Sequence, residues 1–190
     1  MRTSGLIALL VFAAVSAGCQ APPAAPAPPV DPPFRATSTI RELMQSMVAP
    51  SAQGLWDSVG RVSDARGTRD LAPKSTEEWA AVRRHAVSLM ESTNLLLIPG
   101  RHVAREGQQT LKADDAEPGS ELPPSEIEKR INENWAAWTA MAHNLHGSAW
   151  AMLDAIDNKD VARLESTGSD LDGVCESCHL TFWYPQPRAR

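Results

Sequence analysis

The strongest constraint on the fold is an apolar pattern between residues 131 and 156 that repeats every seven positions. A helix turns once in about 3.6 residues, so steps of four and three keep the pattern on one face. Such a face is typical of helices that pack together at a shallow angle. The pattern consists of Ile131, Trp135, Trp138, Ala142, Leu145, Ala149, Met152 and Ile156.

Three other segments carry the same kind of periodicity and have recognisable starts or stops. Ser75-Thr-Glu-Glu78 is a capping box, and Ser125-Glu-Ile-Glu128 has the same pattern. Pro50 predicts a kink in the first helix, because proline lacks the backbone N–H that the helical ladder needs. The predicted helices span residues 37–62, 75–98, 125–157 and 160–184.

The remaining segments of the folded part are predicted to be connections. No segment alternates as a strand does; residues 64–74 indicate a loop, and residues 101–124 a long crossing connection with a short helical piece near 108–113. Four amphipathic helices with short first and third connections predict an antiparallel four-helix bundle. We therefore expect an all-α domain over residues 37–190, for which a hydrophobic content of 43% suffices.

The first residues carry the features of export. Arg2 precedes an apolar run, and small residues follow, which predicts a secretory signal over residues 1–18, too short to span a membrane. Ser16-Ala17-Gly18-Cys19 resembles the lipobox of bacterial lipoproteins, which implies that Cys19 becomes the lipidated first residue. The alternative is an ordinary signal cleaved after Ala17, which leaves Cys19 as a free thiol in a soluble periplasmic protein.

A tether follows Cys19. Residues 19–36 are rich in proline and alanine, so they cannot form helix or sheet and favour extended polyproline II. At about 3.1 Å per residue, the fourteen residues from Gln20 to Pro33 reach roughly 40 Å from a membrane surface. We expect a lipid-anchored protein on the periplasmic side of a bacterial membrane, with the outer membrane favoured. The net charge of −5 and the lack of a basic patch argue against nucleic-acid binding.

The chemistry is concentrated in Cys175-Glu176-Ser177-Cys178-His179, a CxxCH segment close to the end of the fourth helix. Residues three apart on a helix share a face, so both thiols can add to the two vinyl groups on one porphyrin edge. His179 is then carried beneath the ring, where its imidazole can ligate iron. In an exported protein this spacing indicates one covalently attached haem c.

Bundle geometry limits which side chain can face the other side of the iron. The end of the fourth helix should lie level with the start of the first and the end of the second. At about 1.5 Å per residue, Met44, Met47 and Met90 fall near that level, although each is equally a candidate for core packing. By the same count, the more distant candidates are His85, Met141, His143, His146 and Met152.

Two further predictions concern aromatic and histidine side chains. Trp135 is the tryptophan best placed to pack on a porphyrin. His143 and His146 are three residues apart, but two ligands make a poor metal site, so we interpret them as ordinary bundle histidines. His102 lies in a loop with no visible partner.

A CxxCH near the C-terminus of a four-helix chain resembles the cytochrome c′ family, including its low-spin relatives, over residues 39–185. Thr39-Ile-Arg-Glu-Leu-Met44 resembles the first-helix segment whose methionine ligates iron in those relatives, which implies Met44 as sixth ligand. The tail from Leu180 to Pro185 is similar to a subset of the family, but Phe182-Trp183-Tyr184 replaces the basic residue common after the haem histidine. Dimers of this family often use the first two helices, which implies a homodimer here.

Two functions follow from these expectations. The first is electron transfer to a redox partner protein through a His179- and Met44-ligated haem, since a thioether ligand favours ferrous iron. The second is binding of nitric oxide or carbon monoxide by a five-coordinate haem, with Met44 packed beside the iron. A haem-free dithiol protein is a third reading, which the absence of a βαβ pattern disfavours. No nucleophile–base constellation is visible, so we predict no enzymatic activity.

Overall fold

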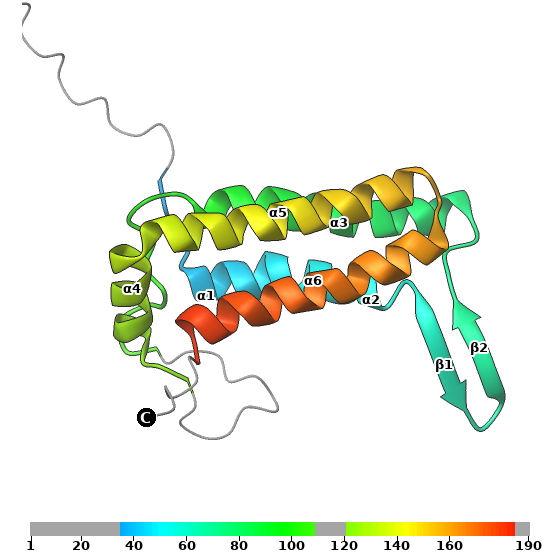
Figure 1. Cartoon of the computed structure of the whole chain (residues 1–190), viewed down its shortest axis with the longest axis horizontal. Helices are drawn as coiled ribbons and strands as arrows, with labels where there is room; N and C mark the ends of the chain where they lie inside the picture. Colours follow the sequence, from blue (N-terminus) through cyan, green and yellow to red (C-terminus); the bar gives the residue numbers. More distant parts are fainter. Residues whose placement is uncertain (1–34, 109–120, 185–190) are drawn as a thin grey trace, which may run out of the picture. The chain divides into compact units, whose positions relative to one another are not determined.

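The computed structural model describes residues 35–108 and 121–184. These residues are mostly helical, as predicted, and include a two-stranded antiparallel sheet (Figure 1). The predicted signal, Cys19, the tether up to residue 34 and most of the expected helical piece at 108–113 lie outside the described residues. The elements are α1 (Ile40–Leu43), the π-helix η1 (Met44–Val48), α2 (Ala49–Trp56), β1 (Gly60–Asp64), β2 (Gly67–Leu71), α3 (Thr76–Leu96), α4 (Pro124–Glu133), α5 (Trp135–Asp157) and α6 (Val161–Phe182).

The long helices pack side by side around a shared apolar core. α5 lies along both α3 and α6, and α2 packs against α3 and α6 (Figure 1). Within the described residues, no helix is both long and apolar enough to cross a membrane. Fully buried core side chains come from all these helices and include Leu55, Leu89, Trp138, Met152, Leu164 and Leu171.

Two of the predicted helices form where the sequence places them. The Ser75 hydroxyl accepts from the Glu78 N–H, and the Glu78 carboxylate accepts from the Ser75 N–H, so the predicted capping box starts α3. The Asp160 side chain accepts from the Arg163 N–H and caps α6. Both caps satisfy N–H groups that have no partner within the helix.

The first helix was predicted to continue to Val62, and that was wrong. Helical structure ends at Trp56, and the segment contains the π-turn η1 immediately before α2. Pro50 is the second residue of α2, a position where its missing N–H costs the helix little. The prediction failed because period-four spacing does not reveal where a helix widens or stops.

Residues 60–71 were predicted as the end of a helix and a loop, and they form a β-hairpin instead. Two glycines with positive φ, Gly60 at 127° and Gly67 at 111°, mark its beginning and its turn. The Asp64 carboxylate accepts from the Arg66 N–H and closes the turn. Figure 1 shows the hairpin extending away from the helices. Its strands carry mostly exposed polar residues, so the apolar alternation that reveals a half-buried strand is missing.

The predicted third helix is broken into α4 and α5. The break lies at Asn134, with φ −126° and ψ 42°, and its side-chain amide donates to the Arg130 carbonyl. Asparagine competes for backbone partners in this way and so interrupts helices. The Ser125 capping box does not form: α4 starts after Pro123, with no side-chain cap. α5 therefore begins ten residues later than the single helix that was expected.

Candidate functional site: a cavity at the CxxCH segment

A cavity of about 420 Å³ lies between η1–α2, α5 and α6. It is mostly apolar, with a few polar side chains along its lining. Val103 and Glu121, which lie on either side of residues 109–120 in the sequence, also line it. Its lining consists of Arg41, Met44, Gln45, Val48, Ala49, Ala52, Gln53, Trp56, Leu96, Val103, Glu121, Trp138, Met141, Ala142, Leu145, Val174, Cys175, Cys178, His179, Trp183 and Tyr184.

α6 brings Cys175, Cys178 and His179 to the same cavity. The helix runs unbroken through all three, so the two thiols, three residues apart, share a face. Both cysteines are free thiols, half-buried and packed against the core. Both cysteines therefore lie on the side of α6 that packs against the core.

Burial makes both thiols weak acids in the folded chain. It raises the pKa of Cys175 to about 11, with a smaller contribution from Asp172. It raises the pKa of Cys178 to about 12, with a further contribution from Cys175. Reactive dithiols depend on a lowered pKa and a ready thiolate. The cavity therefore does not have the electrostatics of a thiol–disulfide exchange site.

The imidazole of His179 is surrounded by aromatic rings. Its ring centroid lies 5.9 Å from that of Trp183 and 5.8 Å from that of Tyr184. Desolvation lowers the pKa of His179, while the charges of Glu176 and Glu121 oppose this effect. The neutral imidazole that burial favours is the form that ligates a metal.

The aromatic tail forms a wall behind His179. Trp183 stacks on Trp138 with centroids 6.2 Å apart, and Phe182 meets Trp138 edge-on at 5.4 Å. The Tyr184 hydroxyl donates to the Glu176 carboxylate at 2.8 Å. Burial, then this hydrogen bond, raises the pKa of Tyr184. The run Phe182-Trp183-Tyr184 thus has a packing role in the described residues.

The methionines that line the cavity are only partly those that were predicted to lie at its level. Met44 lines the cavity, as expected, but Met47 and Met90 are not among its lining residues. Met141 does line it, and the placement of Met141 far from this level was wrong. The break at Asn134 explains the error: counted from the start of α5, Met141 lies only about 9 Å along the helix.

Trp138, rather than the predicted Trp135, lines the cavity. Trp135 is 37% exposed and lines a separate small pocket with Ile40 and Asn132. Trp138 is 1% exposed, and its indole N–H donates to the Leu96 carbonyl at 3.0 Å. The seven-residue pattern contained both tryptophans, so burial by neighbouring helices was the information needed to choose between them.

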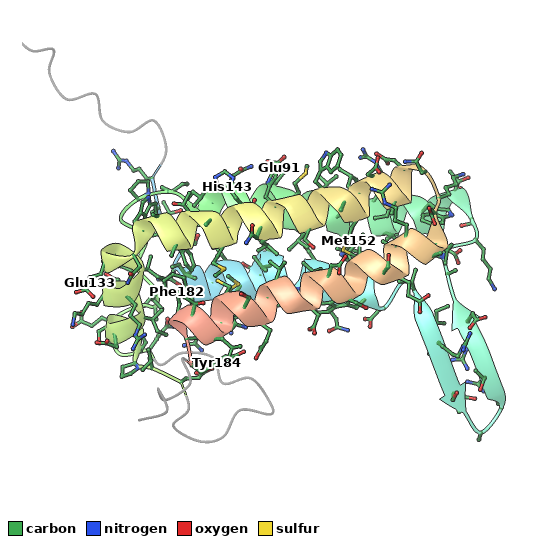
Figure 2. The ribbon with its side chains drawn as sticks, in the orientation of Figure 1. Glu91, Glu133, His143, Met152, Phe182 and Tyr184 are labelled. Atoms are coloured by element: carbon green, nitrogen blue, oxygen red, sulfur yellow. The ribbon has the colours of Figure 1, made fainter. Side chains whose placement is uncertain are left out.

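The histidines other than His179 lie outside the cavity lining. His146 Nδ1 is hydrogen-bonded to the Thr93 hydroxyl at 2.9 Å, and His143 is exposed on the outer side of α5 (Figure 2). His102, which was predicted to have no partner, pairs with the Glu128 carboxylate at 3.0 Å. In residues 35–108 and 121–184, no three His, Cys, Asp or Glu side chains come together as a metal site would need.

Other lining residues were not anticipated from the sequence. Trp56 closes the cavity from α2, and its indole N–H donates to the Gly168 carbonyl of α6 at 2.9 Å. Val103 lies at the start of a connection that was interpreted as a loop, yet it is 1% exposed. The Ile40 and Arg41 N–H groups donate to the carbonyls of residues 102 and 103, which holds this connection against α1.

Comparisons of the chain with protein-family models, with curated proteins and with solved structures find no match. The resemblance to the cytochrome c′ family therefore stays a prediction. The case for a function rests on the geometry of the cavity and on the residues that line it.

Proposed function

We propose that the chain is a mono-haem c-type cytochrome of four-helix-bundle type that transfers electrons and is not an enzyme. In this proposal α1–η1–α2, α3, α4–α5 and α6 are the four helical arms of the bundle. One observation carries it: two thiols, an imidazole and a thioether, from Cys175, Cys178, His179 and Met44, line the same apolar cavity. Side chains from the two ends of the described chain meet there.

The lining fits a haem. A ligand site of this size lies in the usual range of about 300–1,000 Å³, with mainly apolar walls and a few polar groups. The macrocycle is apolar and suits Val48, Leu145 and Val174, while its two carboxylates suit the polar part of the lining, where Arg41 contributes a positive charge.

Each residue has a separate task. Cys175 and Cys178 would each hold the haem by adding a thiol across a vinyl group, with a carbon–sulfur bond formed and the thiol hydrogen moved to the neighbouring carbon. His179 would hold the iron through its imidazole, and Met44 would hold it through its thioether. When bound, the haem supplies a one-electron Fe(III)/Fe(II) couple. Trp138, Trp183 and Leu145 line the cavity and would shield the haem from water, and a dry thioether-ligated site favours the ferrous state.

The attachment is tested on the full-length chain, exported from a bacterium with c-type cytochrome maturation. We expect the mature protein to carry one haem-sized mass adduct that survives acid–acetone extraction. The double substitution Cys175→Ala and Cys178→Ala should abolish the adduct. Ser177→Ala is the matched control, since Ser177 lies between the two cysteines but does not line the cavity. A wild-type protein without the adduct would refute the proposal.

The alternative function is binding of nitric oxide or carbon monoxide at the same site, and one observation favours it. Besides Met44, the cavity is lined by small or apolar side chains of η1, α2 and α5, namely Val48, Ala52 and Ala142. A small apolar space of this kind can admit nitric oxide or carbon monoxide beside the iron. The absorption spectrum separates the two functions: a low-spin spectrum with a thioether–iron band supports electron transfer, and a high-spin spectrum supports gas binding.

We also propose that the protein is exported and faces the periplasm, held to a membrane by a lipid on Cys19. The support is the sequence of residues 1–36, with its apolar run, its lipobox-like segment and its proline-rich spacer. Haem c attachment takes place outside the cytoplasm, so the two proposals agree with each other.

A further inference from the structure

The π-helical turn η1 begins at Met44. The Ala49 N–H donates to the Met44 carbonyl five residues back, instead of four as in an α-helix. A π-turn therefore holds one residue more than an α-turn, and such turns are rare and concentrated at functional sites. In this chain the extra residue follows directly after the methionine that lines the cavity.

Eight residues of this segment line the cavity, and they fall in two adjacent rows that each repeat every four positions. One row consists of Met44, Val48, Ala52 and Trp56, and the other of Arg41, Gln45, Ala49 and Gln53. In a regular α-helix, the twelve steps from Met44 to Trp56 make about 3.3 turns, so the two side chains would point about 120° apart. The π-turn absorbs one residue, and the equivalent of eleven α-helical steps is close to three whole turns. Met44 and Trp56 can therefore line the same cavity.

Both ends of the segment are fixed. At its start, the Thr39 side chain caps α1, and the Ile40 N–H donates to the His102 carbonyl at 2.9 Å. At its end, the Trp56 indole donates to the Gly168 carbonyl at 2.9 Å. The extra residue therefore has to be taken up between these anchors.

Two side chains favour the π-turn over an α-turn. Pro50 has no N–H to donate, and in a continuous α-helix its ring would clash with the Ser46 carbonyl, four residues back. The Ser46 hydroxyl donates to the Glu42 carbonyl, a side-chain bond to the preceding turn of the kind that bends helices.

We propose that the π-turn, maintained by Pro50, is the device that holds Met44 in the cavity. Pro50 is then a positioning residue for the thioether, although its own ring is not among the lining residues. Without the π-turn, the segment before it rotates by about 100° relative to Trp56, and Met44 leaves the cavity face. The inference rests on the proposed function where it treats Met44 as an iron ligand, but the placement of Met44 is independent of any haem.

The test uses three variants of the exported full-length protein. Pro50→Ala removes the obstacle to an α-turn and should turn Met44 out of the cavity. Pro50→Ala combined with deletion of Ser46 removes the extra residue as well, so a regular α-helix brings Met44 back into line with Trp56. Pro73→Ala is the control, because Pro73 is a buried proline away from the cavity lining.

Two readouts are taken on each variant. The absorption spectrum reports thioether ligation, and methyl-carbon NMR of labelled methionine reports contacts of the Met44 methyl with cavity side chains such as Val174. We expect Pro50→Ala to lose at least five-fold in thioether-ligated fraction and to lose those contacts. The deletion should restore both, and Pro73→Ala should change neither.

A Pro50→Ala protein that keeps both the spectrum and the Met44 contacts would overturn the inference. The double variant is the second safeguard: if it stays as defective as Pro50→Ala, helical phase is not the cause, and the inference is also overturned. A wild-type protein without covalent haem would refute the proposed function but not this inference, because the NMR contacts still show where Met44 lies.

Discussion

Two methionine sulfurs line the cavity, and their surroundings differ. Met141 Sδ lies 4.0 Å from the Ser177 hydroxyl, so α6 already contacts it. Met44 comes from η1, on the other side of the cavity from the helix that carries His179. We therefore assign the thioether ligand to Met44 and a packing role to Met141.

Replacement of Met44 by alanine tests this assignment. We expect the haem to stay attached, the spectrum to change from low-spin to high-spin, and the reduction potential to fall by on the order of 100 mV, since a thioether ligand raises it. Met47→Ala should leave spectrum and potential unchanged, because Met47 does not line the cavity. If Met44→Ala remains low-spin and Met141→Ala does not, the assignment is reversed.

The carboxylate of Glu78 gives a prediction about pH. Backbone hydrogen bonds from Lys74 and then Ser75 lower its pKa below the usual 4.5. A group whose pKa is lower in the folded state stabilises the protein above its unfolded pKa and loses that effect as the pH falls through its folded pKa. Glu78→Gln should therefore be less stable than wild type at pH 7, and the difference should shrink in acid.

Urea unfolding of the two proteins at pH 7 and pH 3 measures this difference. Glu77→Gln is a suitable control, because Glu77 lies in the same turn of α3 but does not take part in the capping box. An equal loss of stability at both pH values would show that the capping carboxylate is not responsible.

Among the secondary-structure elements, the hairpin β1–β2 depends on Gly67. Its φ of 111° is a conformation that side chains disfavour, so Gly67→Ala should destabilise the hairpin by about 1 kcal/mol. Backbone chemical shifts of residues 60–71 should move toward disordered values, while the thermal midpoint of the helices changes little. Thr68→Ala is the comparison: Thr68 shares the Ser63 hydroxyl contact but needs no positive φ. A large fall in the global midpoint would contradict this independence.

The secondary-structure elements also show how much of the fold could be predicted from the sequence. Apolar spacing identified α3 and α6 because both carry a long uninterrupted stripe and a capping side chain. The same apolar spacing continues through Asn134 and through η1, because the pattern in the sequence does not mark where the backbone leaves α-helical geometry. The placement of Met141 failed for that reason, and the placement of Met44 at the cavity succeeded.

At the scale of the whole molecule, the size of the cavity is itself informative. Native interiors are close-packed, and apolar side chains that line an unfilled cavity lose packing partners. A protein that cannot attach haem should therefore be less stable than the mature form. We expect Cys175→Ala with Cys178→Ala to lower the thermal midpoint by roughly 4 °C or more, which corresponds to about 1 kcal/mol or more for a chain of this size.

Calorimetry of the double variant beside Ser177→Ala checks that expectation. Both proteins carry substitutions in the same turn of α6, so an effect of helix propensity alone would appear in both. Equal midpoints for the double variant and wild type would mean that the cavity is not normally filled by a covalently attached group.

The anchoring proposal predicts a change in location that leaves the haem site intact. Cys19→Ala should move the protein from the membrane fraction to the soluble periplasmic fraction and abolish labelling with radioactive palmitate. Its haem spectrum should be that of wild type, because Cys19 lies outside the predicted domain over residues 37–190. Retention in the membrane fraction would contradict a lipid on Cys19.

The indole hydrogen bond from Trp56 to Gly168 joins the first helical arm to the last. Ribosomal synthesis proceeds from the N-terminus. The segment η1, which carries Met44, is therefore synthesised long before α6, which carries His179. The cavity cannot close until α6 is complete. On the proposed function, the haem would therefore be enclosed only after α6 is complete, at the last stage of folding.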